Sequence, residues 1–510
     1  MPSSRSCYLP SLCLALTLAA CGPGIEPTSP LDERCGQPEP TQLLALEPDQ
    51  IVPFDRSAVV PYGDRWLVAV STLQRDFDGM FPRDDEIVQS RVISIDACGT
   101  EQPHLIAEGI DMVLPPKEPD LPWMGCDSVS NRMFLIDPEG EVPPTELGMM
   151  DSCHLRQEVP GAIWLKRIVS DQDAQLLRVS SFEGLAMVET SIETVVEHVS
   201  PALRSHTTEG DMIWFVTTDG ELFEYDHSTR DGVLLAEGVG TVSGTSSGFL
   251  AWSDEPESFS AGQWTVYDRE NGTQIPVEIS GQDQVRFMGS ILFSFTFQAT
   301  HDDGTSELLV MRLPSLESTS VRGPWAIVAE TGPGDLILRE NEPTGSLYIL
   351  RSGTEQPELL VDSYTPLVRV DDDDLWVWDY YDHESGLVQD NSTRLVRIPL
   401  GGGEPETIVD DVYQPLALDD GRWLTVRGYA GDGRGELRVV DPHAGTEQVV
   451  DRDVSVWFSR YNDTPDEFFG FGARPSDATF VYSVHDGGAR NGLWSARLTS
   501  APTGDAATPR

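Results

Sequence analysis

The sequence is poor in positive charge, above all in lysine. Its 510 residues include 84 Asp and Glu against 34 Lys and Arg, which gives a formal net charge of −50. Lys117 and Lys166 are its lysines, and no local basic patch interrupts the acidic composition. A negative field of this size repels nucleic acid and anionic membrane surfaces, whereas it favours solubility, cations and basic partners. A role in binding polyanions is therefore disfavoured.

The N-terminus carries an apolar run that is too short to span a membrane. The run extends from Leu12 to Ala20, is preceded by one cation, Arg5, and is followed by Cys21. A transmembrane helix needs about 20 apolar residues, whereas a charged residue followed by a shorter apolar run is the layout of a secretory signal. We therefore expect residues 1–20 to be a signal peptide that plays no part in the fold.

The end of this run, Leu18-Ala19-Ala20-Cys21, resembles the lipobox of bacterial lipoproteins. The resemblance implies cleavage before Cys21 and attachment of diacylglycerol to its sulfur, whose acyl chains supply membrane affinity. Lipoproteins held at the inner membrane usually have Asp after the cysteine, so Gly22 favours the outer membrane. The alternative is an ordinary signal peptide in which Cys21 happens to lie near the cleavage site.

The remaining cysteines lack the close pairs that a zinc site requires. Cys35, Cys98, Cys126 and Cys153 stay in the exported chain. An even number of cysteines in an oxidising compartment suggests two disulfides, for which three connectivities exist. We expect Cys35–Cys98 and Cys126–Cys153; the alternative is free buried thiols.

Helical periodicity is nearly absent, with 191–198 as its one short candidate, and a strand pattern recurs instead. The pattern is a hydrophobic strand, often ending in Asp, with copies VISID (92–96), MFLID (133–137), LLRVS (176–180), LFEYD (222–226), WTVYD (264–268), LLVMR (308–312), LYIL (347–350), LVRIP (395–399), LRVVD (437–441) and LWSAR (493–497). A period near 40–45 residues with four strands per unit is typical of a β-propeller blade. We expect an all-β fold: a single β-propeller of four-stranded blades over 51–498. About ten units are counted, so seven to ten blades are expected; the alternatives are two smaller rings, a β-sandwich array or a β-solenoid.

One unit can be read strand by strand: LVRV (367–370), LWVWDYY (375–381), RLVRIPL (394–400) and ETIVDDV (406–412). It resembles a blade of the TolB-like and WD40-like propeller families, as found in propeller lipoproteins of Gram-negative bacteria. That resemblance implies the fold and no activity. Asp371 to Asp374 are expected in the turn between the first two strands.

Two segments fall outside the repeat. Residues 21–50 are rich in Pro, Glu and Gly and are expected to form a flexible tether, and 499–510 a disordered tail.

Acidic loops are the candidate metal sites. They lie at 75–86, 253–258, 300–307, 382–386, 431–436 and 485–488, each between the second and third strands of a unit, so a propeller would gather them on one rim. Carboxylate oxygens there could bind Ca²⁺, with Asp76, Asp78, Asp382 and Glu384 as weak candidates. The alternative is that these loops are soluble turn formers in an acidic protein.

Motifs for catalysis are weak. Residues 244–248 match G-x-S-x-G, but the pentad leads into a strand (FLAWS, 249–253), whereas a nucleophile elbow leads into a helix. The nine histidines are scattered singly, without H-E-x-x-H spacing. No catalytic residue or cofactor is assigned.

Two functions are consistent with these features. The first is a lipid-anchored envelope protein that binds or scaffolds a protein partner through one acidic propeller rim, without catalysis. The alternative is a calcium-assisted propeller hydrolase or lyase with its site at the ring axis.

Overall fold

The computed structural model describes most of the chain between residues 40 and 497. The gaps are 54–57, 75–85, 117, 119–120, 154–156, 181–190, 203–205, 247, 256–261, 280–284, 292–293, 332–334, 341–345, 362–366, 371–373, 380–393, 419, 429–433, 459–478 and 485–487. The predicted signal peptide, Cys21 and Cys35, and the predicted tail from 499 onward lie outside the described residues, so these expectations stay predictions. The described residues include no helix that could cross a membrane.

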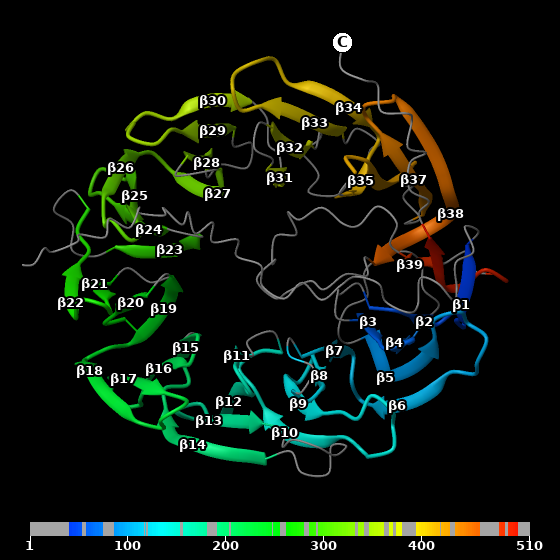
Figure 1. Ribbon diagram of the computed structural model, residues 1–510, viewed down its shortest axis with the longest axis horizontal. Helices are drawn as coiled ribbons and strands as arrows, with labels where there is room; N and C mark the ends of the chain where they lie inside the picture. Colours follow the sequence, from blue (N-terminus) through cyan, green and yellow to red (C-terminus); the bar gives the residue numbers. More distant parts are fainter. Residues whose placement is uncertain are drawn as a thin grey trace, which may run out of the picture.

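The described residues form a single β-propeller of ten blades, seen down its axis in Figure 1. Nine hydrogen-bonded sheets are present among the described residues, and the seven-stranded one contains two blades because the long strand β38 belongs to both. The strands of a blade are termed A to D from the centre outward. The expected all-β propeller is confirmed, with more blades than the usual four to eight.

The first five blades occupy the N-terminal half of the chain. Their strands are β3 (Val59–Tyr62) and β2 (Gln50–Ile51), both on β4 (Arg65–Leu73), then β5 (Ile87–Asp96) and β6 (His104–Glu108); β7 (Met112–Leu114), β8 (Met124–Asp127), β9 (Arg132–Leu135) and β10 (Thr145–Met149); β11 (Gln157–Val159), β12 (Ala162–Ser170), β13 (Asp173–Ser180) and β14 (Ser191–Val199); β15 (His206–Glu209), β16 (Met212–Val216), β17 (Glu221–Asp226) and β18 (Gly232–Glu237); β19 (Thr241–Ser246), β20 (Phe249–Ser253), β21 (Trp264–Asp268) and β22 (Thr273–Pro276).

The other five blades complete the ring. Their strands are β23 (Arg286–Ile291), β24 (Ser294–Thr300), β25 (Ser306–Arg312) and β26 (Ser318–Arg322); β27 (Trp325–Thr331), β28 (Asp335–Glu340), β29 (Leu347–Leu350) and β30 (Glu358–Val361); β31 (Leu367–Val370), β32 (Asp374–Asp379), β33 (Arg394–Pro399) and β34 (Glu406–Asp410); β35 (Tyr413–Ala417), β36 (Trp423–Arg427), β37 (Gly435–Asp441) and β38 (Thr446–Phe458); then the end of β38 with β39 (Thr479–Val484), β40 (Gly492–Arg497) and β1 (Thr41–Ala45).

The repeat seen in the sequence is the third strand of each blade. The ten copies fall on β5, β9, β13, β17, β21, β25, β29, β33, β37 and β40. These strands repeat in the sequence because they lie inside the blade, with a hydrogen-bonded strand on either side and an adjacent blade over each face. Such strands need apolar residues on both faces.

The core is divided into ten hydrophobic clusters among the described residues, one between each pair of adjacent blades. Successive side chains of a strand point to opposite faces. Leu375 and Val377 of β32 therefore pack on the seventh blade, whereas Trp376 packs on the ninth. The two faces of β32 are thus buried against different blades. Each large apolar side chain buried in this way contributes roughly 1.5–3 kcal/mol.

The ring is closed by β1, whose residues were predicted to belong to the flexible tether. β1 pairs antiparallel with β40 and is the outer strand of the tenth blade. The propeller therefore begins at Thr41 and not at residue 51, and the predicted boundary is wrong. The strand was missed because TQLLA stands alone in a polar, Pro-rich segment and its partner lies at the other end of the chain.

Two smaller expectations are also corrected. The helical candidate 191–198 is part of strand β14, where Ile192 and Val196 pair with β13. Asp374 belongs to β32 and not to the preceding turn; its carboxylate lies 2.8 Å from a guanidinium nitrogen of Arg397 on the neighbouring strand.

The closure depends on a close approach between two backbones. A Cβ atom on Gly492, whose φ is +152°, would lie 2.0 Å from the carbonyl oxygen of Leu44. Next to it, the Asn491 amide donates hydrogen bonds to the carbonyl oxygens of Leu46 (3.3 Å) and Glu47 (3.2 Å). These contacts hold the first strand of the chain on the last.

Gly492→Ala is expected to weaken the closure, because the new methyl group and Leu44 cannot occupy their present positions together. We expect the free energy of unfolding to fall by roughly 2–4 kcal/mol, measured as a lower urea midpoint. Gly401→Ala is the matched control, since a Cβ there meets nothing within 4 Å. Equal midpoints for the two variants would show that the approach of Gly492 to Leu44 does not limit the closure.

Candidate functional site

The candidate site is the rim of the propeller that carries the B–C turns and the connections between blades, termed the B–C rim. The opposite rim carries the A–B and C–D turns and is termed the C–D rim. All six acidic loops predicted from the sequence fall between the second and third strands of a blade, at β4–β5, β20–β21, β24–β25, β32–β33, β36–β37 and β39–β40. The loop 300–307 is described in full and lies on this rim; the other five lie wholly or partly outside the described residues, so a shared acidic rim stays a prediction for them.

The residues proposed to bind calcium are not among those described. Asp76, Asp78, Asp382 and Glu384 lie in the gaps 75–85 and 380–393. Within the described part of the chain, no group of three or more His, Cys, Asp or Glu side chains could hold a metal ion. The calcium site thus stays an untested prediction.

Three acidic side chains stand at the tips of described B–C turns. Asp171, Asp219 and Asp302 belong to the third, fourth and sixth blades, and all three are exposed. Among the described residues none of the three has a hydrogen-bond or ion-pair partner, unlike Asp127 and Asp303 at other B–C turns. Their negative charge is therefore available to a partner from solution.

The acidic residues that end the third strands have a different role, because they cap the C–D turns. Asp226 accepts hydrogen bonds from the backbone N–H groups of Ser228 (2.8 Å) and Thr229 (3.0 Å). The same arrangement recurs at Asp96, Asp137, Asp268 and Asp441. The Asp seen in the sequence repeat is thus a turn-forming residue.

These caps favour the charged form of the carboxylate. The Ser228 hydroxyl, followed by the backbone of Thr229, lowers the pKa of Asp226. At Asp268 the Asn271 side chain lowers the pKa in the same way. Burial raises the pKa of Asp96, but the hydrogen bonds from Thr100 outweigh it, so that the pKa is lowered overall.

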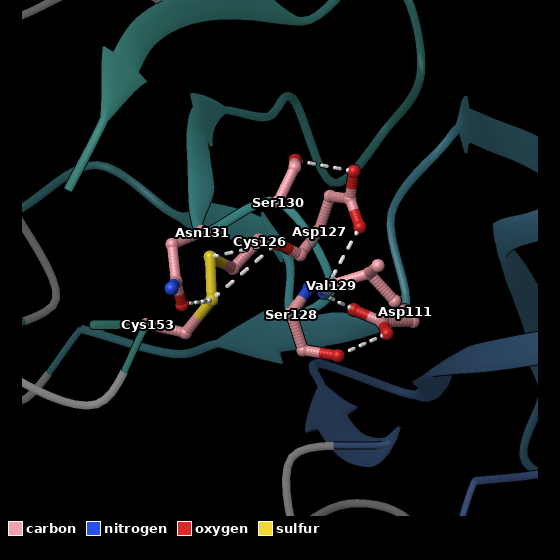
Figure 2. The surroundings of a disulfide bond; sticks show 8 residues. All are labelled: Asp111, Cys126, Asp127, Ser128, Val129, Ser130, Asn131 and Cys153. Carbon is pink, nitrogen blue, oxygen red and sulfur yellow. Dashed lines mark hydrogen bonds between the residues drawn. A yellow bond between two sulfur atoms is a disulfide. The ribbon is translucent and has the colours of Figure 1, made fainter. Parts of the chain in front are cut away.

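A disulfide and a buried carboxylate lie together at the B–C rim of the second blade (Figure 2). Cys126 and Cys153 form the predicted disulfide, which ties β8 to the connection that leads into the third blade. Asp111, in the connection from the first blade, accepts a 2.8 Å hydrogen bond from the backbone N–H of Ser128 and another from its hydroxyl. Burial raises the pKa of Asp111 and outweighs the hydrogen bonds from Ser128, which lower it; the charge of Asp127 adds a smaller rise.

The second predicted disulfide is described at one end. Cys98 lies in the C–D turn of the first blade and is disulfide-bonded. Cys35 lies outside the described residues, so the pairing Cys35–Cys98 remains a prediction.

A buried lysine lies near the B–C rim and was not singled out from the sequence. The Lys166 ammonium group pairs with the Asp151 carboxylate and donates to the carbonyl oxygen of Ala202 at 2.6 Å. Burial lowers the pKa of Lys166, and Asp151 opposes that shift. One signal was present: in a chain with two lysines, this one interrupts an apolar strand, AIWLKRIV.

A histidine, a glutamate and a serine are linked in the sixth blade, but not as a catalytic triad. His301 Nε2 lies 2.9 Å from a carboxylate oxygen of Glu307, and the hydroxyl of Ser320 donates to the other oxygen. A nucleophilic serine needs the imidazole as its base, with the carboxylate behind the imidazole. In this blade the carboxylate lies between them, so the arrangement does not activate the hydroxyl.

A third buried cluster joins the ninth and tenth blades. The Tyr482 hydroxyl donates a 2.6 Å hydrogen bond to Asp451, and the Arg490 guanidinium donates to the other carboxylate oxygen. Burial, together with the hydrogen bond to Asp451, raises the pKa of Tyr482. All groups of this cluster are paired with each other, so it stabilises the junction where β38 passes from one blade to the next.

The G-x-S-x-G pentad is part of a β-hairpin, as the sequence indicated. Ser246 ends β19, Phe249 begins β20, and the two residues are opposite each other in the antiparallel register. Gly248, with a φ of +83°, forms the turn, and its N–H donates to the Glu209 carboxylate at 3.1 Å. A strand–turn–strand context excludes a nucleophile elbow.

No protein-family model and no curated protein matches the sequence. Solved structures are similar in parts: Porphyromonas gingivalis dipeptidyl peptidase 4 at 10% identity (TM-score 0.39, 70% of this chain and 63% of that chain) and the tricorn protease at 11% (TM-score 0.31, 90% and 61%). The propeller domain of the trilobed protease from Pyrococcus furiosus is 13% identical (TM-score 0.28, 59% and 98%). The chain thus spans under two thirds of the first two proteins, and these similarities concern the fold alone.

Asp111→Asn is expected to stabilise the protein at neutral pH. The raised pKa means that the folded state disfavours the ionised form of Asp111. The stabilisation that the protonated carboxyl group provides is therefore complete below the ordinary pKa of Asp, and it is lost as the pH rises through the raised pKa. Asparagine carries no charge, so the variant avoids the free-energy cost of burying an ionised carboxylate. We expect its free energy of unfolding to exceed that of the wild type by roughly 1 kcal/mol at pH 7, and the difference to shrink towards pH 4.

The measurement is the urea midpoint between pH 4 and pH 8. Asp171→Asn, at an exposed turn without a partner, is the control and should leave the midpoint unchanged. If the urea midpoints of Asp111→Asn and the wild type were equal at every pH, the cost assigned to burying the Asp111 carboxylate would be wrong.

Proposed function

We propose that the protein is a lipid-anchored protein of the cell envelope that binds a basic partner protein through its acidic B–C rim, without catalysing a reaction. The observation that carries this proposal is the placement of Asp171, Asp219 and Asp302. They extend from three blades of one closed ring on the same rim, and they are exposed and without partners among the described residues. Fixed charges on a rigid scaffold select a partner by electrostatic complementarity.

The lipid anchor rests on the resemblance of Leu18 to Cys21 to a lipobox. Lipid at Cys21 would hold the protein at the membrane, with the outer membrane favoured by Gly22. Mass spectrometry of the mature N-terminus tests this part separately: an acylated Cys21 is expected, and Cys21→Ser should release the protein from membranes. A mature N-terminus without acyl groups would refute the anchor.

Charge reversal tests the binding surface. The triple variant Asp171→Lys, Asp219→Lys and Asp302→Lys is expected to bind a lysine decapeptide at least roughly tenfold more weakly than the wild type at low salt, because three charges that attract the probe become repulsive. The control triple, Asp231→Lys, Glu270→Lys and Glu317→Lys, makes the same change in net charge on the C–D rim, where these three side chains are exposed.

The comparison between the two triples decides the proposal. We expect the B–C rim variant to lose binding of the lysine decapeptide and the control variant largely to keep it. Cross-linking to proteins of the solubilised envelope should likewise be weaker for the B–C rim variant than for the control. Equal losses would show that total charge, rather than this rim, attracts basic partners.

A further inference from the structure

The path of β1 shows on which side the preceding segment enters the ring. β1 runs antiparallel to β40, with Ala45 opposite Gly492 and Thr41 opposite Ser495. β40 begins after the B–C turn of the tenth blade and runs to the C–D rim. Thr41 therefore lies towards the C–D rim, and residues that precede it reach the ring from that side.

A neighbouring turn marks the same point of entry. The C–D turn of the first blade approaches β1 so closely that a Cβ on Gly99 would lie 2.8 Å from the carbonyl oxygen of Gln42. Cys98, the residue before this glycine, is disulfide-bonded. Its predicted partner, Cys35, is six residues before Thr41 in the sequence. A disulfide at this turn would hold the tether against the C–D rim.

We propose that the C–D rim faces the membrane, with the tether held at Cys98, and that the B–C rim faces away from it. This inference rests on the lipid anchor proposed above. Between Cys21 and Cys35 lie 13 residues, which reach about 45 Å when fully extended and roughly 20 Å on average as a flexible chain. A partner would therefore approach the acidic B–C rim from the side opposite the lipid.

The charge of the C–D rim indicates that it stands off from the bilayer. Asp231, Glu270 and Glu317 are exposed there, and like charges repel the anionic lipid headgroups over about a Debye length of 8 Å. Attachment would thus come from the lipid and the tether, not from the rim itself. Since β17 has six residues, the two rims differ in height by about 20 Å.

Energy transfer to labelled lipid tests the orientation. The lipidated protein would carry one donor dye, attached through p-azidophenylalanine at Asp219 or Asp231 of the fourth blade, or at Asp302 or Glu317 of the sixth. Each pair has one exposed position on each rim. The vesicles would contain phosphatidylethanolamine and phosphatidylglycerol with rhodamine-labelled headgroups.

We expect transfer efficiency at Asp231 and Glu317 to exceed that at Asp219 and Asp302 by roughly 1.5-fold or more, because about 20 Å separates the rims. Cys98→Ser lengthens the free tether up to Thr41, so the efficiency at Asp231 and Glu317 should fall while the order of the rims is kept. Equal or reversed efficiencies in the oxidised protein would overturn the orientation. An unchanged efficiency in the Cys98 variant would overturn the role of that residue as the holding point.

Failure of the anchor gives a different result. If the protein did not associate with vesicles any better than its Cys21→Ser variant, the lipid anchor itself would be refuted and this inference with it. If the wild type bound through acylated Cys21 but showed no difference between rims, the orientation alone would be wrong.

Discussion

The structure depends on one constraint: a four-stranded blade has two apolar faces and cannot cover either by itself. Adjacent blades cover each other's faces, so every blade needs two neighbours and the array is stable only as a closed ring. The pairing of β1 with β40 meets this requirement. It completes the tenth blade, and the cluster around Trp66, Val481 and Leu493 then buries the face between the last blade and the first.

The same constraint explains which features recur in the sequence. Third strands lie inside each blade and recur as apolar segments, whereas first strands such as QEV (β11) and outer strands such as TQIP (β22) are short and polar. Asp226 and its equivalents recur because the C–D turns use their carboxylates as backbone caps. Some B–C turns are capped in the same way, as at Asp127 and Asp303, whereas Asp171 at another B–C turn has no partner among the described residues and is available to bind a partner protein.

The sequence was sufficient to predict the fold class, the ten units and the position of the acidic segments between second and third strands, because these depend on local patterns that repeat. It was also sufficient for the Cys126–Cys153 pair. It was insufficient for β1, because these five residues are part of the sheet only through their pairing with β40, which is distant in the sequence. Nor could it distinguish Asp171, which has no partner, from Asp151, which neutralises the buried Lys166, because both are acidic residues in connections between strands.

Closure by the first strand also constrains how the chain can reach its folded state. Gln42 and Asn491 meet across the closure although 449 residues separate them. Bringing such distant segments together costs about 5 kcal/mol of chain entropy, to first order, and contacts of this separation form slowly. β1 is synthesised long before β40, so it cannot pair until synthesis has reached β40. During that interval the two terminal blades present unpaired edges and uncovered apolar faces, a state that favours aggregation and that a chaperone would be suited to protect.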